Sequence, residues 1–182
     1  LTLIAVVAPS WCGPAMGADE VTFSTAFEGA SLGRIEKVDE TTELSGVVIS
    51  GVDRMSERKA IWQAVQYADV PLYIDGRIGG ELCQAFTVRP GEPKDMDFYE
   101  AWLIDDERAS DLPCGASKIG YPSTLLSARM AAIIARFSRN LPVPWMIDDN
   151  LHKFTSVVIW NPDDEKMLEQ EEEQEHGTHQ EH

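Results

Sequence analysis

The feature that most constrains the fold is an uncharged run rich in β-branched residues, GVVISGV, over residues 46–52. A strand without a polar face is typical of a parallel sheet that is covered on both sides. Residues 56–68 then show helical spacing, with Ile61, Val65 and Ala68 on one face. A second buried run, VPLYID, follows over 70–75. A strand, a helix and a strand within about 30 residues predict a parallel β–α–β crossover.

The remaining segments predict further strands and one long helix around this crossover. Strands are expected over 3–8, 82–88 and 154–160, with a weaker one over 21–27, and turns over 76–80 and 89–94. Residues 123–138 show a broad apolar face behind Pro122, with Ser123 as the expected N-cap. Residues 98–104 are aromatic without a clear period, so strand and helix both stay open for them. The expected fold class is α/β, with a partial Rossmann-like, three-layer sheet whose C-terminal half is mixed.

Charge divides the chain into a body and a tail. The 182 residues carry a net charge of −16, and residues 163–182 hold nine Asp and Glu against one Lys, a net charge of −8. We expect 162–182 to be a disordered acidic tail, 44–161 to form the main domain, and 1–43 to be a divergent or truncated N-terminal part. An acidic body does not suit the phosphate backbone of nucleic acids, so no nucleic-acid partner is expected.

The cysteines and the apolar runs indicate the expected compartment of the protein. Cys12, Cys83 and Cys114 are an odd number at wide spacings, which fits a reducing cytoplasm and no zinc site. No run approaches the roughly 20 apolar residues of a membrane span, so no membrane partner is expected. Cys83 lies in the 82–88 strand and is expected in the core. Cys114 lies in a Pro-Cys-Gly loop where Lys118 could lower its pKa, and a buried, inert thiol is the alternative.

Two carboxylates follow the buried strands. Asp53 comes directly after residues 46–52, and Asp75 ends the run over 70–75. In open α/β sheets, ligands bind beyond the carboxyl ends of the strands. A carboxylate there can hold Mg²⁺ or a ribose hydroxyl, or it can cap the next helix. Arg58, in that helix, either contacts a phosphate or forms an exposed i, i+4 pair.

The order of these features resembles the ThiF/MoeB/HesA group of E1-like enzymes. The matching segments, which extend over about residues 44–160, are Val48–Asp53, Arg58, Pro71–Gly76, Gly79–Glu81, Pro113–Gly115, Gly120 and the small-residue-rich helix over 123–138. In that family a hydrophobic strand ends in an Asp and the next helix carries an Arg. A strand with a Gly-containing turn and then a loop cysteine follow. These enzymes adenylate the C-terminal glycine of ubiquitin-like or sulfur-carrier proteins.

The resemblance implies a site, a cofactor and partners. Asp53 would hold ATP through Mg²⁺, Arg58 would face the phosphates, and Cys114 would accept the acyl group. The C-terminal tail of the partner would run past the charged residues of one turn, unless these only form an ordinary turn with paired charges. Those residues are Asp75, Arg77 and Glu81. The resemblance also implies a homodimer or a heterodimer.

One family feature is missing from the sequence. Members of the family open with a Gly-x-Gly-x-x-Gly loop that holds the phosphates, and no such pattern occurs in the 182 residues. Two functions therefore stay open. The chain is part of an ATP-dependent adenylating enzyme, as a fragment, a split gene product or a subunit completed by another chain. Alternatively, it is a non-catalytic E1-like module for binding or dimerisation that has lost ATP binding.

Overall fold

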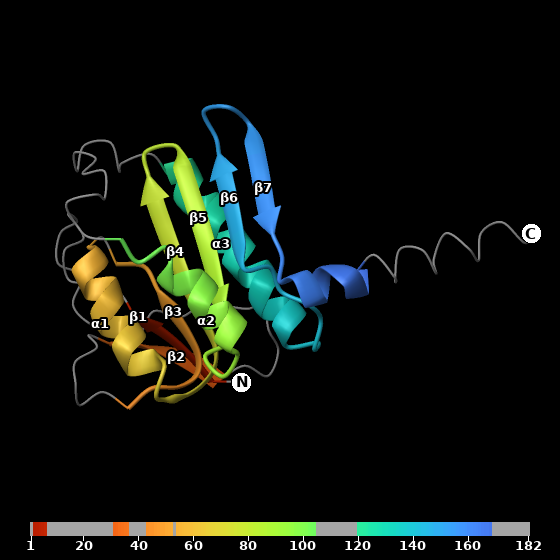
Figure 1. The fold of residues 1–182 in the computed structure, drawn as a ribbon. Coiled ribbons are helices and arrows are strands. Elements are labelled where there is room, and N and C mark those ends of the chain that lie inside the picture. Colours follow the sequence, from red (N-terminus) through yellow and green to blue (C-terminus); the bar gives the residue numbers. More distant parts are fainter. Residues whose placement is uncertain (1, 7–30, 37–42, 53, 105–119, 169–182) are drawn as a thin grey trace, which may run out of the picture.

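The chain folds around one mixed sheet of seven strands. The computed structural model describes residues 2–6, 31–36, 43–52, 54–104 and 120–168. The order of the strands across the sheet is β2-β1-β3-β4-β5-β6-β7 (Figure 1). Their bounds are β1 Thr2–Val6, β2 Ser31–Glu36, β3 Ser45–Ser50, β4 Asp69–Gly79, β5 Leu82–Val88, β6 Met146–Asn150 and β7 Thr155–Ile159. The first four strands of that order pair in parallel and the rest pair antiparallel, so the expected mixed α/β class is confirmed.

The predicted crossover is present. Helix α1 (Met55–Val65) connects β3 to β4, and these two strands pair in parallel. However, β4 runs to Gly79, four residues further than the sequence indicated, so the prediction of a turn over 76–80 is wrong. Antiparallel pairing with β5 prolongs the strand, and the reversal occupies only Gly80 and Glu81. Gly80 has a φ of 64°, a conformation that glycine adopts without steric cost.

Two elements differ from the sequence-based assignment between residues 89 and 150. Helix α2 (Pro93–Glu100) begins inside the segment predicted as a turn over 89–94, with its proline in the first turn where no amide hydrogen bond is lost. Residues 101–104 are not regular, so neither option for 98–104 describes the whole segment. Strand β6 was not predicted, because three of its five residues are Asp or Asn.

The long helix, α3 (Gly120–Phe137), begins earlier than predicted. Ser123 is not its N-cap, since the Ser123 hydroxyl donates to the Gly120 carbonyl, 2.7 Å away, from within the first turn. At the other end of the chain, residues 162–168 are helical, which corrects the expectation of disorder for those seven residues. The rest of the predicted tail and the weak strand over 21–27 lie outside the described residues.

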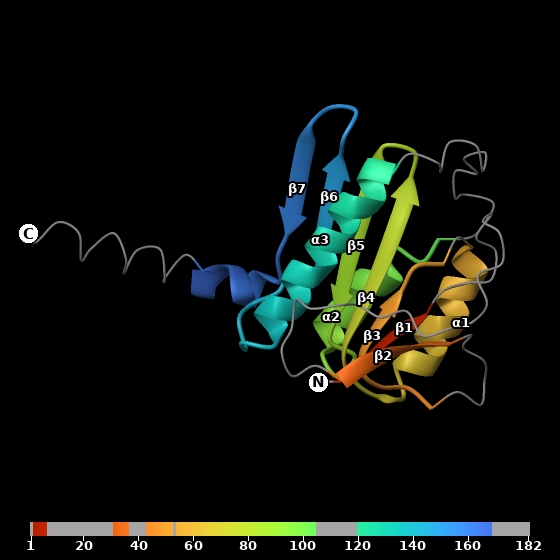
Figure 2. The same cartoon turned by 180° about the vertical axis from the view of Figure 1, so that it is seen from behind.

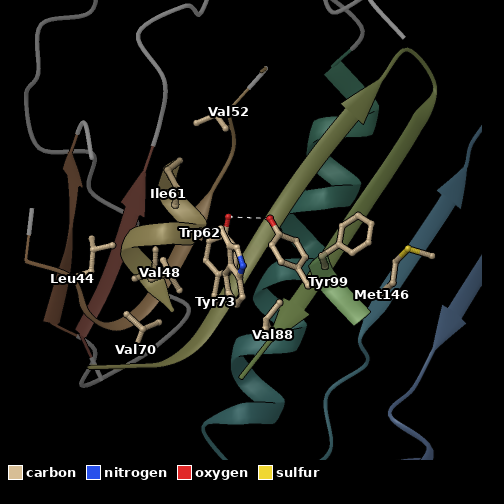
Figure 3. Packing of buried hydrophobic residues seen from close by; sticks show 12 residues of the cluster. Leu44, Val48, Val52, Ile61, Trp62, Val70, Tyr73, Val88, Tyr99 and Met146 are labelled. Atoms are coloured by element: carbon tan, nitrogen blue, oxygen red, sulfur yellow. Dashed lines mark hydrogen bonds between the residues drawn. The ribbon is translucent and has the colours of Figure 1, made fainter. Parts of the chain in front are cut away.

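Helices cover both faces of the sheet. On one face, α1 and α2 bury a cluster that contains Trp62, Tyr73, Phe86 and Tyr99 (Figure 3). On the other face, α3 packs over the central strands (Figure 2) and buries Leu72, Ile74, Leu126 and Ile133, among others. Residues 47 and 48 of β3 belong to opposite clusters, which explains why the GVVISGV run has no polar face.

Candidate functional site

The connections between the parallel strands change direction between β1 and β3. Strand β2 lies on one side of β1, whereas the chain leads from β3 through α1 to β4 on the other side (Figure 1). In open α/β sheets, ligands bind at such a switch, beyond the carboxyl ends of the two strands that flank it. Gly51 and Val52 follow β3 at that edge. Asp53, which the resemblance assigns to ATP and Mg²⁺, lies outside the described residues.

Asp75 does not stand at a strand end, which corrects that part of the sequence-based prediction. It lies inside β4 and pairs in register with Ser50, the last residue of β3. Its exposed fraction is 0%. The sequence placed it at an end because VPLYID is followed by three glycines within five residues, whereas pairing with β5 keeps the strand extended.

The Asp75 carboxylate accepts hydrogen bonds from four side chains. Oδ1 accepts from the Ser50 hydroxyl at 2.8 Å and from Nη1 of Arg58. Oδ2 accepts from Nε of Arg77 at 2.8 Å and from the Tyr99 hydroxyl at 3.1 Å. We call these five residues the Asp75 cluster. With all of these partners and no exposure, the carboxylate has no room for a metal ion or for a partner's tail.

Arg58 is buried, with an exposed fraction of 5%, so an exposed i, i+4 pair is ruled out for it. Besides Asp75, its guanidinium donates to two backbone carbonyls. Nη1 reaches the oxygen of Gly76 at 3.2 Å, and Nη2 binds the oxygen of Val52. Arg58 therefore fastens the segment after β3 to β4, and it positions the neighbourhood of residue 53.

Arg77 is held on three sides. Nε binds Asp75, Nη1 donates to the Trp102 carbonyl at 3.1 Å, and the guanidinium carbon lies 4.1 Å from the centre of the Phe86 ring. Burial alone would lower the pKa of Arg77, but Asp75 and Tyr99 beside it raise the pKa above its ordinary value. Nη2 is buried and has no hydrogen-bond partner in the part of the chain that the structure describes.

Two tyrosines complete the surroundings of the carboxylate. The Tyr73 hydroxyl lies 2.8 Å from the Ser50 hydroxyl and 3.4 Å from the Tyr99 hydroxyl, as the dashed line in Figure 3 shows for the latter pair. Burial raises the pKa of both tyrosines, and Asp75 raises it further. Both rings therefore stay neutral phenols at neutral pH. Across the cluster, one carboxylate faces two guanidinium groups.

Glu81 belongs to a different contact. It accepts a hydrogen bond from the Tyr121 hydroxyl, and its Oε2 lies 3.0 Å from Nδ1 of His152. The bond from Tyr121 is the main cause of a lowered pKa at Glu81. His152 has an exposed side chain. The three residues predicted to lie along the partner's C-terminal tail therefore do not form one group. Asp75 and Arg77 are in contact, whereas Glu81 binds two other residues.

The described cysteine, Cys83, is buried in the core. Cys83 has an exposed fraction of 1%, and burial, together with the nearby Asp149, raises the pKa of its thiol to about 11. Its predicted place in the core is confirmed. Cys12, Cys114 and Lys118 lie outside the described residues.

Sequence reasoning missed Ser50 and Tyr99 as members of the cluster, and Tyr73 beside it. A signal existed for Ser50 and Tyr73, since each is a polar-tipped residue within a buried run, GVVISGV or VPLYI. Tyr99 had no such signal, because only the packing of α2 brings it to Asp75.

No protein-family model matches the chain, and no curated protein matches it either. Within the described ranges, no group of three or more His, Cys, Asp or Glu residues is placed to hold a metal ion. None of the described helices is long and apolar enough to cross a membrane.

Proposed function

We propose that this chain is an E1-like protein that adenylates the C-terminal carboxylate of a ubiquitin-like or sulfur-carrier partner. The observation that supports this is the position of the switch point. That point lies between β1 and β3, where Gly51 and Val52 follow the end of β3 and α1 begins at Met55. The ThiF-type resemblance puts its nucleotide-binding Asp at the same place, residue 53. The finer fold assignment, a Rossmann-like E1 domain, is part of this proposal.

The proposed reaction has two steps. An oxygen of the partner's carboxylate attacks the α-phosphorus of ATP, the bond to the bridging oxygen breaks, and pyrophosphate leaves. The thiolate of Cys114 then attacks the carbonyl of the acyl-adenylate, so that a thioester forms and AMP leaves. Asp53 would hold a Mg²⁺ ion, which neutralises charge on the phosphates.

The Asp75 cluster holds the backbone beside the proposed site in place. Arg58 holds the Val52 carbonyl, directly before residue 53, and is itself fixed by Asp75. We therefore assign Arg58 a positioning role and not the phosphate contact that the resemblance implied. The carboxylate of Asp75 is fully occupied by its four donors, so residue 53 is the better candidate for the metal.

Pyrophosphate exchange into ATP, measured with candidate partner proteins, tests the proposal. We expect exchange that depends on the partner and falls by about tenfold or more in Asp53→Asn, because the metal loses its protein ligand. Asp163→Asn removes the same charge from an exposed position and should leave exchange unchanged. Exchange that is equal in Asp53→Asn and in the unmodified chain would rule out the role given to Asp53.

The missing Gly-x-Gly-x-x-Gly pattern favours a second candidate function. In this alternative the chain is a non-catalytic E1-like module that binds a partner or a second copy. The outer face of α3, with Ala128 and Ala132 exposed, offers small side chains for close helix packing. Calorimetry with ATP–Mg²⁺ distinguishes the two functions, since micromolar binding by the chain contradicts the alternative.

A further inference from the structure

The Asp75 cluster has more positive than negative charge. Arg58 and Arg77 both pair with the one carboxylate of Asp75, and their side chains are 6% and 11% exposed. Buried charge is costly unless it is neutralised, and among the described residues this pairing supplies one carboxylate for two guanidinium groups. Such an excess is notable in a chain whose net charge is −16.

One buried guanidinium nitrogen also has no hydrogen-bond partner among the described residues. Arg58 uses Nη1 and Nη2 on protein oxygens, whereas Arg77 uses Nε on Asp75 and Nη1 on the Trp102 carbonyl. Nη2 of Arg77 remains buried without a hydrogen-bond partner in the described ranges. The contacts of Nε and Nη1, and the Phe86 ring below, hold the guanidinium so that this nitrogen points in a fixed direction.

Arg77 also stands at the proposed site. Because Asp75 pairs with the last residue of β3, Arg77 lies two residues beyond the carboxyl end of that strand. Residues Gly76 to Gly79 of β4 therefore extend beyond the end of β3 and line one side of the carboxyl edge of the sheet. An anion bound at that edge would lie beside these residues.

We propose that Nη2 of Arg77 binds an oxyanion of the reactants, a phosphoryl or a carboxylate oxygen. The inference rests on the proposed function for the source of the anion, which is either the nucleotide or the terminus of the partner protein. A water molecule could accept the same hydrogen bonds, but only an anion also neutralises the charge. Since Nη2 is buried, the anion reaches it only when side chains around the guanidinium move.

Calorimetric titration of the full chain at constant ionic strength tests this site directly. One arm uses pyrophosphate. The other uses a short peptide ending in Gly-Gly, with a free carboxylate or with an amidated end. We expect one arm to show binding that is about tenfold weaker in Arg77→Lys, which keeps a charge for Asp75 but lacks the second nitrogen. Arg77→Gln should bind more weakly still.

Arg129→Gln is the matched control. Arg129 also pairs with a buried carboxylate, Asp149, but from α3 on the opposite face of the sheet. This variant should keep the anion affinity of the unmodified chain. The Arg77→Lys variant is checked by urea unfolding, so that a loss of fold is not taken for a loss of binding.

The outcomes separate this inference from the proposed function. Binding of pyrophosphate that depends on Arg77 identifies the nucleotide as the source, and binding only of the free-carboxylate peptide identifies the partner's terminus. Anion binding without any pyrophosphate exchange would contradict the proposed function and would still support the anion site. No binding in either arm, or equal affinity in Arg77→Lys, overturns the inference.

Discussion

Asp75 connects two strands and two helices through its side chain. Its partners come from β3, α1, α2 and its own strand, and two of them are cationic. We expect Asp75→Asn to lower the free energy of unfolding by about 3–5 kcal/mol, because Arg58 and Arg77 then stay buried without a counter-charge. Urea unfolding followed by far-UV circular dichroism measures the difference.

Asp163 provides the comparison for that measurement. It pairs with Lys94 in a salt bridge whose side chains are 60% and 65% exposed. Because water screens such a pair, Asp163→Asn should change stability far less than Asp75→Asn does. Similar losses in the two variants would show that the Asp75 cluster contributes little to the fold.

Cys83 offers a second prediction for a single residue. With a pKa of about 11, roughly one thiol in a thousand is ionised at pH 8, so alkylation of the native chain should be very slow. The experiment uses Cys12→Ser/Cys114→Ser, in which Cys83 is the one remaining thiol. Labelling with iodoacetamide should be fast in urea and should quicken in the native chain as the pH rises towards 11. Rapid native labelling at pH 8 would contradict the burial of this thiol.

At the level of elements, prediction succeeds where a pattern is local. The β3–α1–β4 unit follows from an uncharged strand, a helical period and a second buried strand. It fails where distant residues decide the structure. Strand β6 contains Asp149, which is buried only because Arg129 of α3 binds both of its oxygens at 3.0 Å. Likewise, α2 buries Asp95, whose partners come from three other segments: Arg89, Trp145 and Asn161.

The contact between β4 and α3 depends on the small size of Gly76. A Cβ atom there would lie 3.2 Å from Cδ2 of Leu126 and 3.3 Å from Sδ of Met130. We expect Gly76→Val to lower the unfolding free energy by about 1–3 kcal/mol, because the helix must move away from the sheet. Differential scanning calorimetry measures the change.

Gly51 is the matched position for that substitution. It also lies near the carboxyl edge of the sheet, but a Cβ atom on Gly51 would have no atom of the described residues within 4 Å, so Gly51→Val should cost less. If both variants lose the same stability, close packing of α3 on Gly76 is not what requires the glycine.

At the scale of the whole molecule, the sequence predicted a site after β3 but not the contacts of the Asp75 cluster. The end of a buried strand and the start of the next helix led to that prediction. The cluster depends on β4 continuing past β3 and on α2 bringing Tyr99 to Asp75, and neither has a local signal. The exposed-pair option for Arg58 is wrong for the same reason, since two of its partners, Asp75 and Gly76, lie 17 and 18 residues further along the chain.

The acid stability of the whole chain should depend on its buried aspartates. Burial alone would raise the pKa of Asp95 and of Asp149, but hydrogen bonds from Arg89 and Trp145, and from Arg129, lower both pKa values below the ordinary one. The unfolded chain therefore binds protons at these sites at a higher pH than the folded chain does. Stability from these groups is fully present above the unfolded carboxyl pKa of about 3.9 and is lost as the pH falls through the lower folded values.

Asp149→Asn tests this expectation. At pH 7 we expect a loss of about 1–2 kcal/mol, moderated because Arg129 is 36% exposed and screened by water. Towards pH 3 the carboxylate of the unmodified chain becomes protonated, so the two stability curves should converge. Urea midpoints between pH 3 and pH 7 measure both curves, with Asp163→Asn as a variant of equal charge whose curve should stay close to that of the unmodified chain. If the stability of Asp149→Asn differs from that of the unmodified chain by the same amount at every pH, this aspartate does not cause the loss of stability in acid.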